Sequence, residues 1–238
     1  STSDIINALG TSRSTGYRYI KALNSVGLLG AVGNGYYVLG SRIIELDLLI
    51  RRTDPLLQSA KGVLEQLVEA TGHTALLCML FQNSVLCIAE KLAPLSPKML
   101  FSRGQKRPMF KGAASKIILA HLPNHRLRTI YAKRQELIRE SGLGETWTDF
   151  RDQLSRIRAN GYVKSVGEFI PGNVGIAAPI FNVDGNIIGS IGIACGKDEL
   201  RDSDLNRVTL SVKRAAKEIR TKMSTEDSGL ALLPRAVG

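Results

Sequence analysis

The segment from Ser12 to Val26 (SRSTGYRYIKALNSV) contains hydroxyl and basic side chains and no acidic residue. Its candidate DNA contacts, gathered mostly in the first turns of an expected helix, are Ser12, Arg13, Ser14, Thr15, Tyr17, Arg18 and Lys21. Arginine pairs with guanine edges, hydroxyl groups suit phosphate oxygens, and a helix N-terminus itself attracts phosphate. We therefore predict a recognition helix that enters the major groove of duplex DNA.

The flanking elements support this interpretation. Residues 1–9 predict a short helix with Ser3 as its N-cap, and Gly10 ends that helix before Ser12 caps the next. Two helices joined by a short turn at a glycine are typical of a helix-turn-helix. The apolar positions of the second helix are Tyr19, Ile20, Leu23 and Val26, of which Ile20 and Leu23 are expected to face the rest of the domain.

Two short apolar runs, 28–32 and 36–39, surround a Gly-Asn-Gly turn centred on Asn34. This pattern predicts a hairpin, and a hairpin placed directly after a recognition helix is a wing, so Asn34 is also a candidate DNA contact. A solvated basic helix in a small bundle is the alternative. The preceding helix and the wing favour DNA binding.

Length and charge set further bounds on the 238-residue chain. No apolar run approaches the roughly 20 residues that span a bilayer. No signal peptide is visible either, so we expect a cytoplasmic protein without a membrane partner. The net charge of +11 lies mainly in residues 98–139, which hold eleven Lys or Arg against Glu136 alone. The DNA-binding prediction therefore depends on residue placement in 12–26 and not on net charge.

The remaining chain predicts a second domain that mixes helices with antiparallel strands. Residues 41–53 are apolar nearly all round, which favours a linker helix that also packs against a partner subunit. Helices are expected at 54–71, 111–122, 124–138, 148–160 (capped by Thr148 or Asp149) and 202–224, and strands at 74–81, 84–90, 98–102, 163–168, 174–182 and 187–195. The order of these elements indicates an α+β fold, and residues 225–238 are expected to be a flexible tail.

The cysteines and histidines show no metal-ligand spacing, so we predict neither a metal site nor a cofactor. If Gln82 and Asn83 form a two-residue turn, Cys78 and Cys87 lie opposite each other. A cross-strand disulfide is then geometrically allowed, but a reducing cytosol favours two buried thiols.

Three strings of this sequence resemble the IclR-type family of transcriptional regulators. They are TSRSTGYRYIKALNSVGLLG followed by YYVLG, RPMFKGAASKIILAHL, and GNVGIAAPIFNVDGNIIGSIGIACG. The resemblance implies a winged helix-turn-helix at 1–40 with a first helix preceding Ser1, a linker helix at 41–53 and a GAF/profilin-like effector-binding domain at 54–224. It also implies a homodimer or tetramer on palindromic operators, with a small organic acid or aromatic catabolite as effector. We expect a ligand-responsive repressor or activator of a catabolic operon.

The same resemblance assigns an effector pocket to Gly112, Ala113, Ala114, Glu168, Gly175, Ile176, Gly192 and Ala194. Many family members have Cys where Gly175 stands and Ser at positions 192 and 194. Phe110 replaces a usual His, and Lys111 adds a charge. These departures predict a roomier, less polar pocket that suits a larger or more apolar ligand than a small keto acid.

Parts of the sequence could suggest three other functions. Ser115 and Lys116 could suggest a nucleophile pair, but neighbours on a helix point about 100° apart. We therefore expect no enzyme, with Ser115 packed and Lys116 at the surface or an interface. The basic stretch 98–139 lacks the aromatic residues typical of single-strand binders, so we interpret it as a solvated face or a guide for an anionic ligand. A GAF-like dimerising domain that has lost ligand binding is the third alternative.

Overall fold

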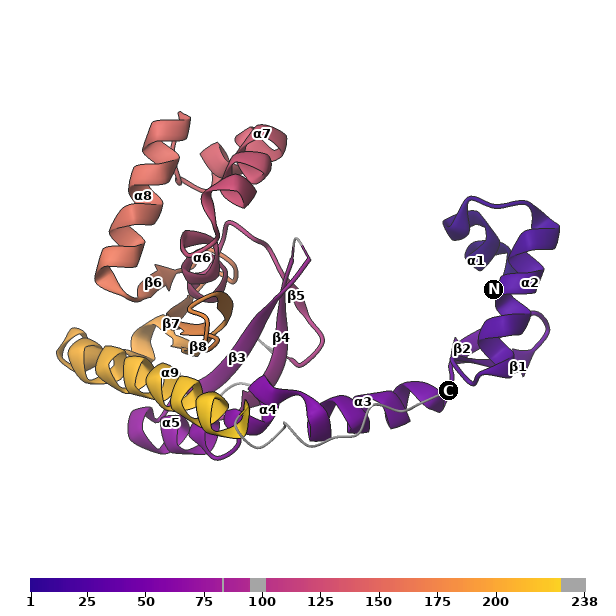
Figure 1. Ribbon diagram of the computed structural model, residues 1–238, viewed down its shortest axis with the longest axis horizontal. Coiled ribbons are helices and arrows are strands. Elements are labelled where there is room, and N and C mark those ends of the chain that lie inside the picture. Colours follow the sequence, from indigo (N-terminus) through magenta and orange to yellow (C-terminus); the bar gives the residue numbers. More distant parts are fainter. Residues whose placement is uncertain (83, 95–101, 228–238) are drawn as a thin grey trace. The chain divides into compact units, whose positions relative to one another are not determined.

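The computed structural model describes residues 1–82, 84–94 and 102–227, and the chain divides into two compact units (Figure 1). The first unit is Ser1–Asp54 and the second is Pro55–Gly238. The first unit comprises α1 (Thr2–Leu9), α2 (Arg13–Ser25), β1 (Leu29–Gly33), β2 (Tyr36–Leu39) and α3 (Arg42–Thr53). No helix among the described residues is long and apolar enough to cross a membrane.

The N-cap of the first helix lies two residues earlier than the sequence predicts. Ser1, and not Ser3, caps α1: its hydroxyl accepts from the Asp4 N–H at 3.4 Å, and the Asp4 carboxylate accepts from the N-terminal amine. Ser3 lies inside the helix because this reciprocal capping box already satisfies the first turn. Gly10 ends α1 in the left-handed conformation with φ 59°, and Ser12 caps α2 as predicted.

The contact between α1 and α2 depends on a glycine. Gly16 and Ile20 are the buried residues of α2, and a Cβ at Gly16 would lie 2.4 Å from Cγ1 of Ile6. Ile20 is buried and Leu23 is partly buried, as expected, whereas Tyr19 and Val26 are about half exposed. The eight-residue α1 covers only the narrow stripe through Gly16 and Ile20, so the neighbouring apolar positions stay in solvent.

The predicted wing is present as an antiparallel hairpin in which Leu29 pairs with Leu39. Its turn places Asn34 at φ 49° and Gly35 at φ 73°, a left-handed pair that asparagine and glycine tolerate. At the base of the wing Gly40 crosses very close to the backbone of Gly27, where a Cβ would meet the carbonyl oxygen at 1.9 Å. The chain then enters α3, in which no residue is buried within this chain.

The second unit is built on one six-stranded antiparallel sheet in the order β5-β4-β3-β8-β7-β6. The strands are β3 (Thr74–Phe81), β4 (Ser84–Lys91), β5 (Lys106–Arg107), β6 (Val163–Val166), β7 (Asn173–Phe181) and β8 (Ile187–Gly196). The helices are α4 (Pro55–Ser59), α5 (Val63–Thr71), α6 (Ala113–Ala120), α7 (Asn124–Glu140), α8 (Trp147–Asn160) and α9 (Leu205–Asp227), with short 3-10 turns η1 (Lys197–Glu199) and η2 (Asp202–Asp204). The α+β fold class is therefore confirmed.

Helices cover both faces of the central strands (Figure 1). One core forms where α4, α5 and α9 pack on the sheet, and it includes Leu67, Ile176 and Val212. A second core forms beneath α6 and includes Ala177 and Ile117, and α7 and α8 close a third around Phe150. Because side chains alternate along a strand, neighbouring residues of β7 and β8 serve opposite faces.

Several predicted bounds were wrong for local reasons. The single helix expected at 54–71 is broken into α4 and α5 by Gly62, which adopts φ 80°. Thr146 caps α8 by exchanging hydrogen bonds with Asp149, so neither Thr148 nor Asp149 is the cap. β6 ends at Val166, which leaves Glu168 in the loop that follows. The strand expected at 98–102 and the tail expected at 225–238 lie mostly outside the described residues, although α9 continues to Asp227.

The register of β3 and β4 confirms the predicted hairpin. Phe81 pairs with Ser84 and Cys78 pairs with Cys87, and Gln82 adopts a positive φ of 53° in the turn. Both cysteines are buried free thiols, as expected.

Candidate functional site

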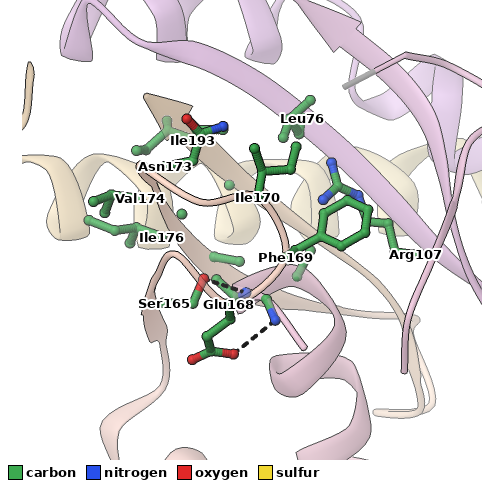
Figure 2. A pocket seen from close by; sticks show the side chains of 17 residues that line it. Leu76, Arg107, Ser165, Glu168, Phe169, Ile170, Asn173, Val174, Ile176 and Ile193 are labelled. Carbon is green, nitrogen blue, oxygen red and sulfur yellow. Dashed lines mark hydrogen bonds between the residues drawn. The ribbon is translucent and has the colours of Figure 1, made fainter. Parts of the chain in front are cut away.

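A pocket lies between the N-terminus of α6, strands β7 and β8 and the loop after β6 (Figure 2). Its lining comprises residues 112–114, 168–170, 173–177 and 192–194 together with Leu76, Arg107 and Ser165. All eight residues assigned from the resemblance lie in this lining. The structure thus brings together four segments that are up to 82 positions apart in sequence, from Gly112 to Ala194.

The first N–H groups of α6 point into the pocket and already have partners. Gly112 adopts φ 84° and donates its N–H to Oε2 of Glu168 at 3.0 Å, while the Ala113 N–H donates to Oγ of Ser165, also at 3.0 Å (Figure 2). A helix N-terminus attracts negative charge because its first N–H groups lack intrahelical acceptors. Glu168 is the anion that meets this demand in the present structure.

Lys116 forms an ion pair with Glu168 beside the N-terminus of α6. Its Nζ lies 2.7 Å from Oε2 of Glu168, and its side chain is only 12% exposed. The expectation of a surface or interface lysine is therefore wrong. One turn along α6 separates Lys116 from Gly112, so both face the same carboxylate. Ser115 is buried as expected, and its hydroxyl has no hydrogen-bond partner among the described residues.

Arg107 and Phe169 form a part of the lining that sequence reasoning missed. The guanidinium carbon of Arg107 lies 5.6 Å from the centre of the Phe169 ring, a cation–π contact (Figure 2). β5 has only two residues, too few for a strand period, and the loop at Phe169 has no regular element. The only signal was the position of Arg107 as the first residue of the string that carries Gly112.

That the pocket is roomier than in other family members stays a prediction, and the cavity of this chain is small. The cavity measures about 40 Å³, enough for only a few water molecules. A Cβ at Gly192 would lie 2.2 Å from the carbonyl oxygen of Ile176, so this glycine brings β7 and β8 close together and opens no space. The Ile176 side chain belongs to the core beneath α5 and α9, so Ile176 borders the pocket through its backbone.

The expectation of lower polarity agrees with the structure. Gly175 carries no side chain, and Ala194 packs with Ala113 in the core beneath α6. Leu76 and Phe169 add apolar surface on the far side. The polar groups of the lining are therefore concentrated around Glu168 and the N-terminus of α6.

A pair of thiols lies beside this pocket. A hydrogen bond from Cys87 lowers the pKa of Cys78, with a smaller contribution from Arg107, and the same thiol–thiol contact and burial raise the pKa of Cys87. Arg107 thus connects the pocket lining to the β3–β4 hairpin.

The candidate DNA contacts occupy one helix and one turn of the first unit. Arg13, Ser14, Tyr17, Arg18 and Lys21 are exposed on α2, and Asn34 is exposed in the wing turn. Ser12 and Thr15 are engaged with each other, because the Ser12 hydroxyl caps the helix and lies 3.0 Å from the Thr15 hydroxyl. The Arg13 guanidinium lies over the Tyr17 ring at 5.9 Å. Tyr19 is exposed on the same helix and was not among the candidate contacts.

Comparison with known proteins decides the family. The C-terminal domain family described as bacterial transcriptional regulator IclR C-terminal matches residues 50–221 of this chain. The chain belongs to the IclR family. It is a transcriptional regulator of the IclR class, whose members bind DNA and respond to effector ligands.

Individual relatives agree with this assignment. The chain is 28% identical to the HTH-type transcriptional regulator KipR of Bacillus subtilis, over 93% of this chain and 88% of that protein. It is 25% identical to the glycerol operon regulatory protein of Streptomyces coelicolor, over 84% of this chain and 80% of that protein. An IclR homologue from Microbacterium hydrocarbonoxydans, solved in complex with 4-hydroxybenzoate, shares the fold with a TM-score of 0.73 at 21% identity, over 94% and 91% of the two chains.

The close approach at Gly192 leads to a stability prediction for this IclR-family chain. Gly192→Ser forces a Cβ against the Ile176 carbonyl, so we expect the free energy of unfolding to fall by about 1–3 kcal/mol. Ala194→Ser adds the same hydroxyl where a Cβ already fits, and it should cost less. Urea denaturation of both variants measures the difference. Equal losses would show that Gly192 does not hold the strands together.

Proposed function

We propose that this chain is a ligand-responsive regulator that binds operator DNA through α2 and the wing, and a small organic or aromatic acid through the pocket at α6. The observation that carries the ligand proposal is the N-terminus of α6, which together with Lys116 holds a carboxylate beside an apolar wall. At present that carboxylate belongs to Glu168. An acidic effector would compete with it for the same N–H groups and the same ammonium.

The chemistry of the lining supports an acid with an apolar body. Gly112 and Ala113 offer two backbone donors and Lys116 offers a cation, while Leu76 and Phe169 offer apolar surface. Because the cavity is only about 40 Å³, a ligand of this kind must displace part of the lining. Glu168 and Phe169 are the lining residues that we expect to move. The 4-hydroxybenzoate bound by the Microbacterium relative is one aromatic acid of this class.

The arrangement of α2 supports sequence-specific recognition of duplex DNA. Arg18 and Lys21 are exposed in the middle of α2, and Asn34 occupies the wing turn. Because the Ser12 hydroxyl caps the helix, we assign it to helix stability first and to phosphate contact second. The named relative that regulates a glycerol operon makes a catabolic operon our proposed target.

The exposed face of α3 supports assembly into a homodimer or tetramer. Six large apolar side chains of this helix are exposed within the chain, namely Ile43, Ile44, Leu46, Leu48, Leu49 and Ile50. A helix that is apolar nearly all round requires a cover, and a second copy of the chain supplies one. Two copies would also present two recognition helices to a palindromic operator.

We also propose that the chain has no catalytic role and acts in the cytoplasm, where the DNA is. Its relatives are named as regulators, and the one nucleophile-like pair, Ser115 and Lys116, is split because Lys116 pairs with Glu168.

One prediction concerns the role of Arg18 in DNA recognition. Arg18→Ala should weaken binding to a duplex selected by the full chain from a random library by about 1–3 kcal/mol, because a two-pronged contact to guanine is lost. Fluorescence anisotropy gives the affinity. Arg156→Ala, the same change at an exposed site of the second unit, is the control. Equal affinity of the Arg18 variant and the control would remove Arg18 from the contact set.

Another prediction concerns the binding of an acidic effector. An acid that binds the folded chain must raise its melting temperature, so 4-hydroxybenzoate and a panel of aromatic and short aliphatic acids are screened with the full chain. Lys116→Met should weaken binding of the active acid by at least about tenfold, since Glu168 then repels it unopposed. Lys111→Met removes an exposed neighbouring charge and should not. If no acid stabilises the chain, the dimerising domain without ligand binding becomes the better interpretation.

A further prediction concerns the assembly of the chain into a dimer or tetramer. Ile44→Glu, at a residue 76% exposed within the chain, should shift the mass in light scattering toward the 25.9 kDa of one copy. A buried unpaired carboxylate in the interface is the physical reason. Arg52→Glu places the same residue at a polar position of α3 and should leave the assembly intact. A dimer that tolerates Ile44→Glu would exclude this face of α3 as the interface.

A further inference from the structure

Three residues with metal-binding side chains meet at the end of β3 and β8, on the opposite face of the sheet from the pocket. His73 immediately precedes β3, Cys195 lies near the end of β8, and Glu199 ends the short turn η1. Thr74 pairs with Ala194 across the two strands, so the same register continued by one residue sets His73 beside Cys195. One ligand atom from each of the three residues lies within 4.8 Å of the other two.

The burial of this cluster is unusual for polar groups. His73 is 9% exposed and Cys195 is 6% exposed. Within residues 1–82, 84–94 and 102–227, neither the imidazole ring nor the thiol has a hydrogen-bond partner, and the ring nitrogens keep some contact with solvent. The carboxylate of Glu199 is held in place by the Gly196 N–H, which donates to Oε2 at 3.1 Å.

We propose that His73, Cys195 and Glu199 bind a zinc ion. An imidazole nitrogen, a thiolate sulfur and a carboxylate oxygen are the ligand types that Zn²⁺ takes in proteins, and three protein ligands with one open position form a common tetrahedral set. Ligand atoms at about 2.0–2.3 Å from such an ion lie about 3–4 Å apart. The side chain of Glu199 is exposed, and closing the remaining gap requires it to shift away from the Gly196 N–H.

The surrounding charges are arranged in pairs. Burial lowers the pKa of His73, which keeps the ring neutral with a lone pair available to a metal. Arg207 lies near the ring, but its guanidinium is 3.2 Å from the Asp204 carboxylate. On the other side Lys164 lies near Cys195 and 3.9 Å from Asp202. Each cation thus has an acidic neighbour.

The Cys195 thiol must lose its proton to become a metal ligand. Burial raises the pKa of Cys195 to about 11, so the ion must displace the thiol proton as it binds. A zinc ion here would join β3, β8 and the turn leading to α9. Cys195 directly follows Ala194 of the pocket lining, but its side chain belongs to the core on the other face.

The test uses the full chain after removal of metals by a chelator. Zn²⁺ alone is titrated by calorimetry, and Co²⁺ replaces it for absorption spectroscopy, where a thiolate-to-cobalt charge-transfer band reports the Cys195 bond. We expect one ion per chain. Glu199→Gln, at an exposed residue that leaves the fold intact, should weaken Zn²⁺ binding by at least about 10- to 100-fold. His73→Ala should do the same, and Cys195→Ser should abolish the cobalt band.

Matched controls separate this cluster from the other thiols and imidazoles. Cys87→Ala and His125→Ala should retain both the affinity and the band. The proposal is overturned if the wild-type chain binds no Zn²⁺. It is also overturned if Glu199→Gln binds as tightly as the wild type, or if the band depends on Cys87 and survives Cys195→Ser.

Discussion

The carboxylate of Glu168, which pairs with both the N-terminus of α6 and the ammonium of Lys116, forms the interaction on which the sensing unit depends. Without Glu168 the first N–H of α6 would face the cavity unpaired, and Lys116 would be a nearly buried cation without its partner. Both arrangements are costly in a protein interior. The sheet beneath makes the meeting possible, because Gly192 lets β7 and β8 approach closely enough for the small residues of α6 to pack against them.

Much of this architecture is predictable from local patterns. The wing follows from the Asn34 turn, the cap of α2 from Ser12, and the β3–β4 register from the turn at Gln82. Each of these features depends on residues close together in sequence, where turn chemistry and periodicity act directly. The eight residues of the pocket came from a resemblance to a family and not from periodicity, and the structure does gather them in one lining.

The features that the sequence did not reveal depend on contacts between distant segments. Lys116 reads as a surface residue until Glu168, on a loop 52 positions away, is placed beside it. The space at Gly192 is likewise decided by the backbone of Ile176 on another strand. His73 and Cys195 show no ligand spacing along the chain, and only the register of β3 with β8 makes them neighbours. Pairing between strands, unlike a turn, leaves no mark at a fixed sequence interval.

The internal carboxylate also constrains what the pocket can recognise. An acid that enters must replace the bond between Glu168 and Lys116, so its charge contributes only the difference between two similar ion pairs. Selectivity then depends on the rest of the ligand. Its binding is stabilised by burying apolar surface against Leu76, Phe169 and Ala194. A two-carbon or three-carbon keto acid has little such surface, whereas an aromatic acid has a whole ring. Under the proposed function, the departures at Gly175, Gly192 and Ala194 favour a bulkier effector through the lower polarity of the lining and through competition with Glu168.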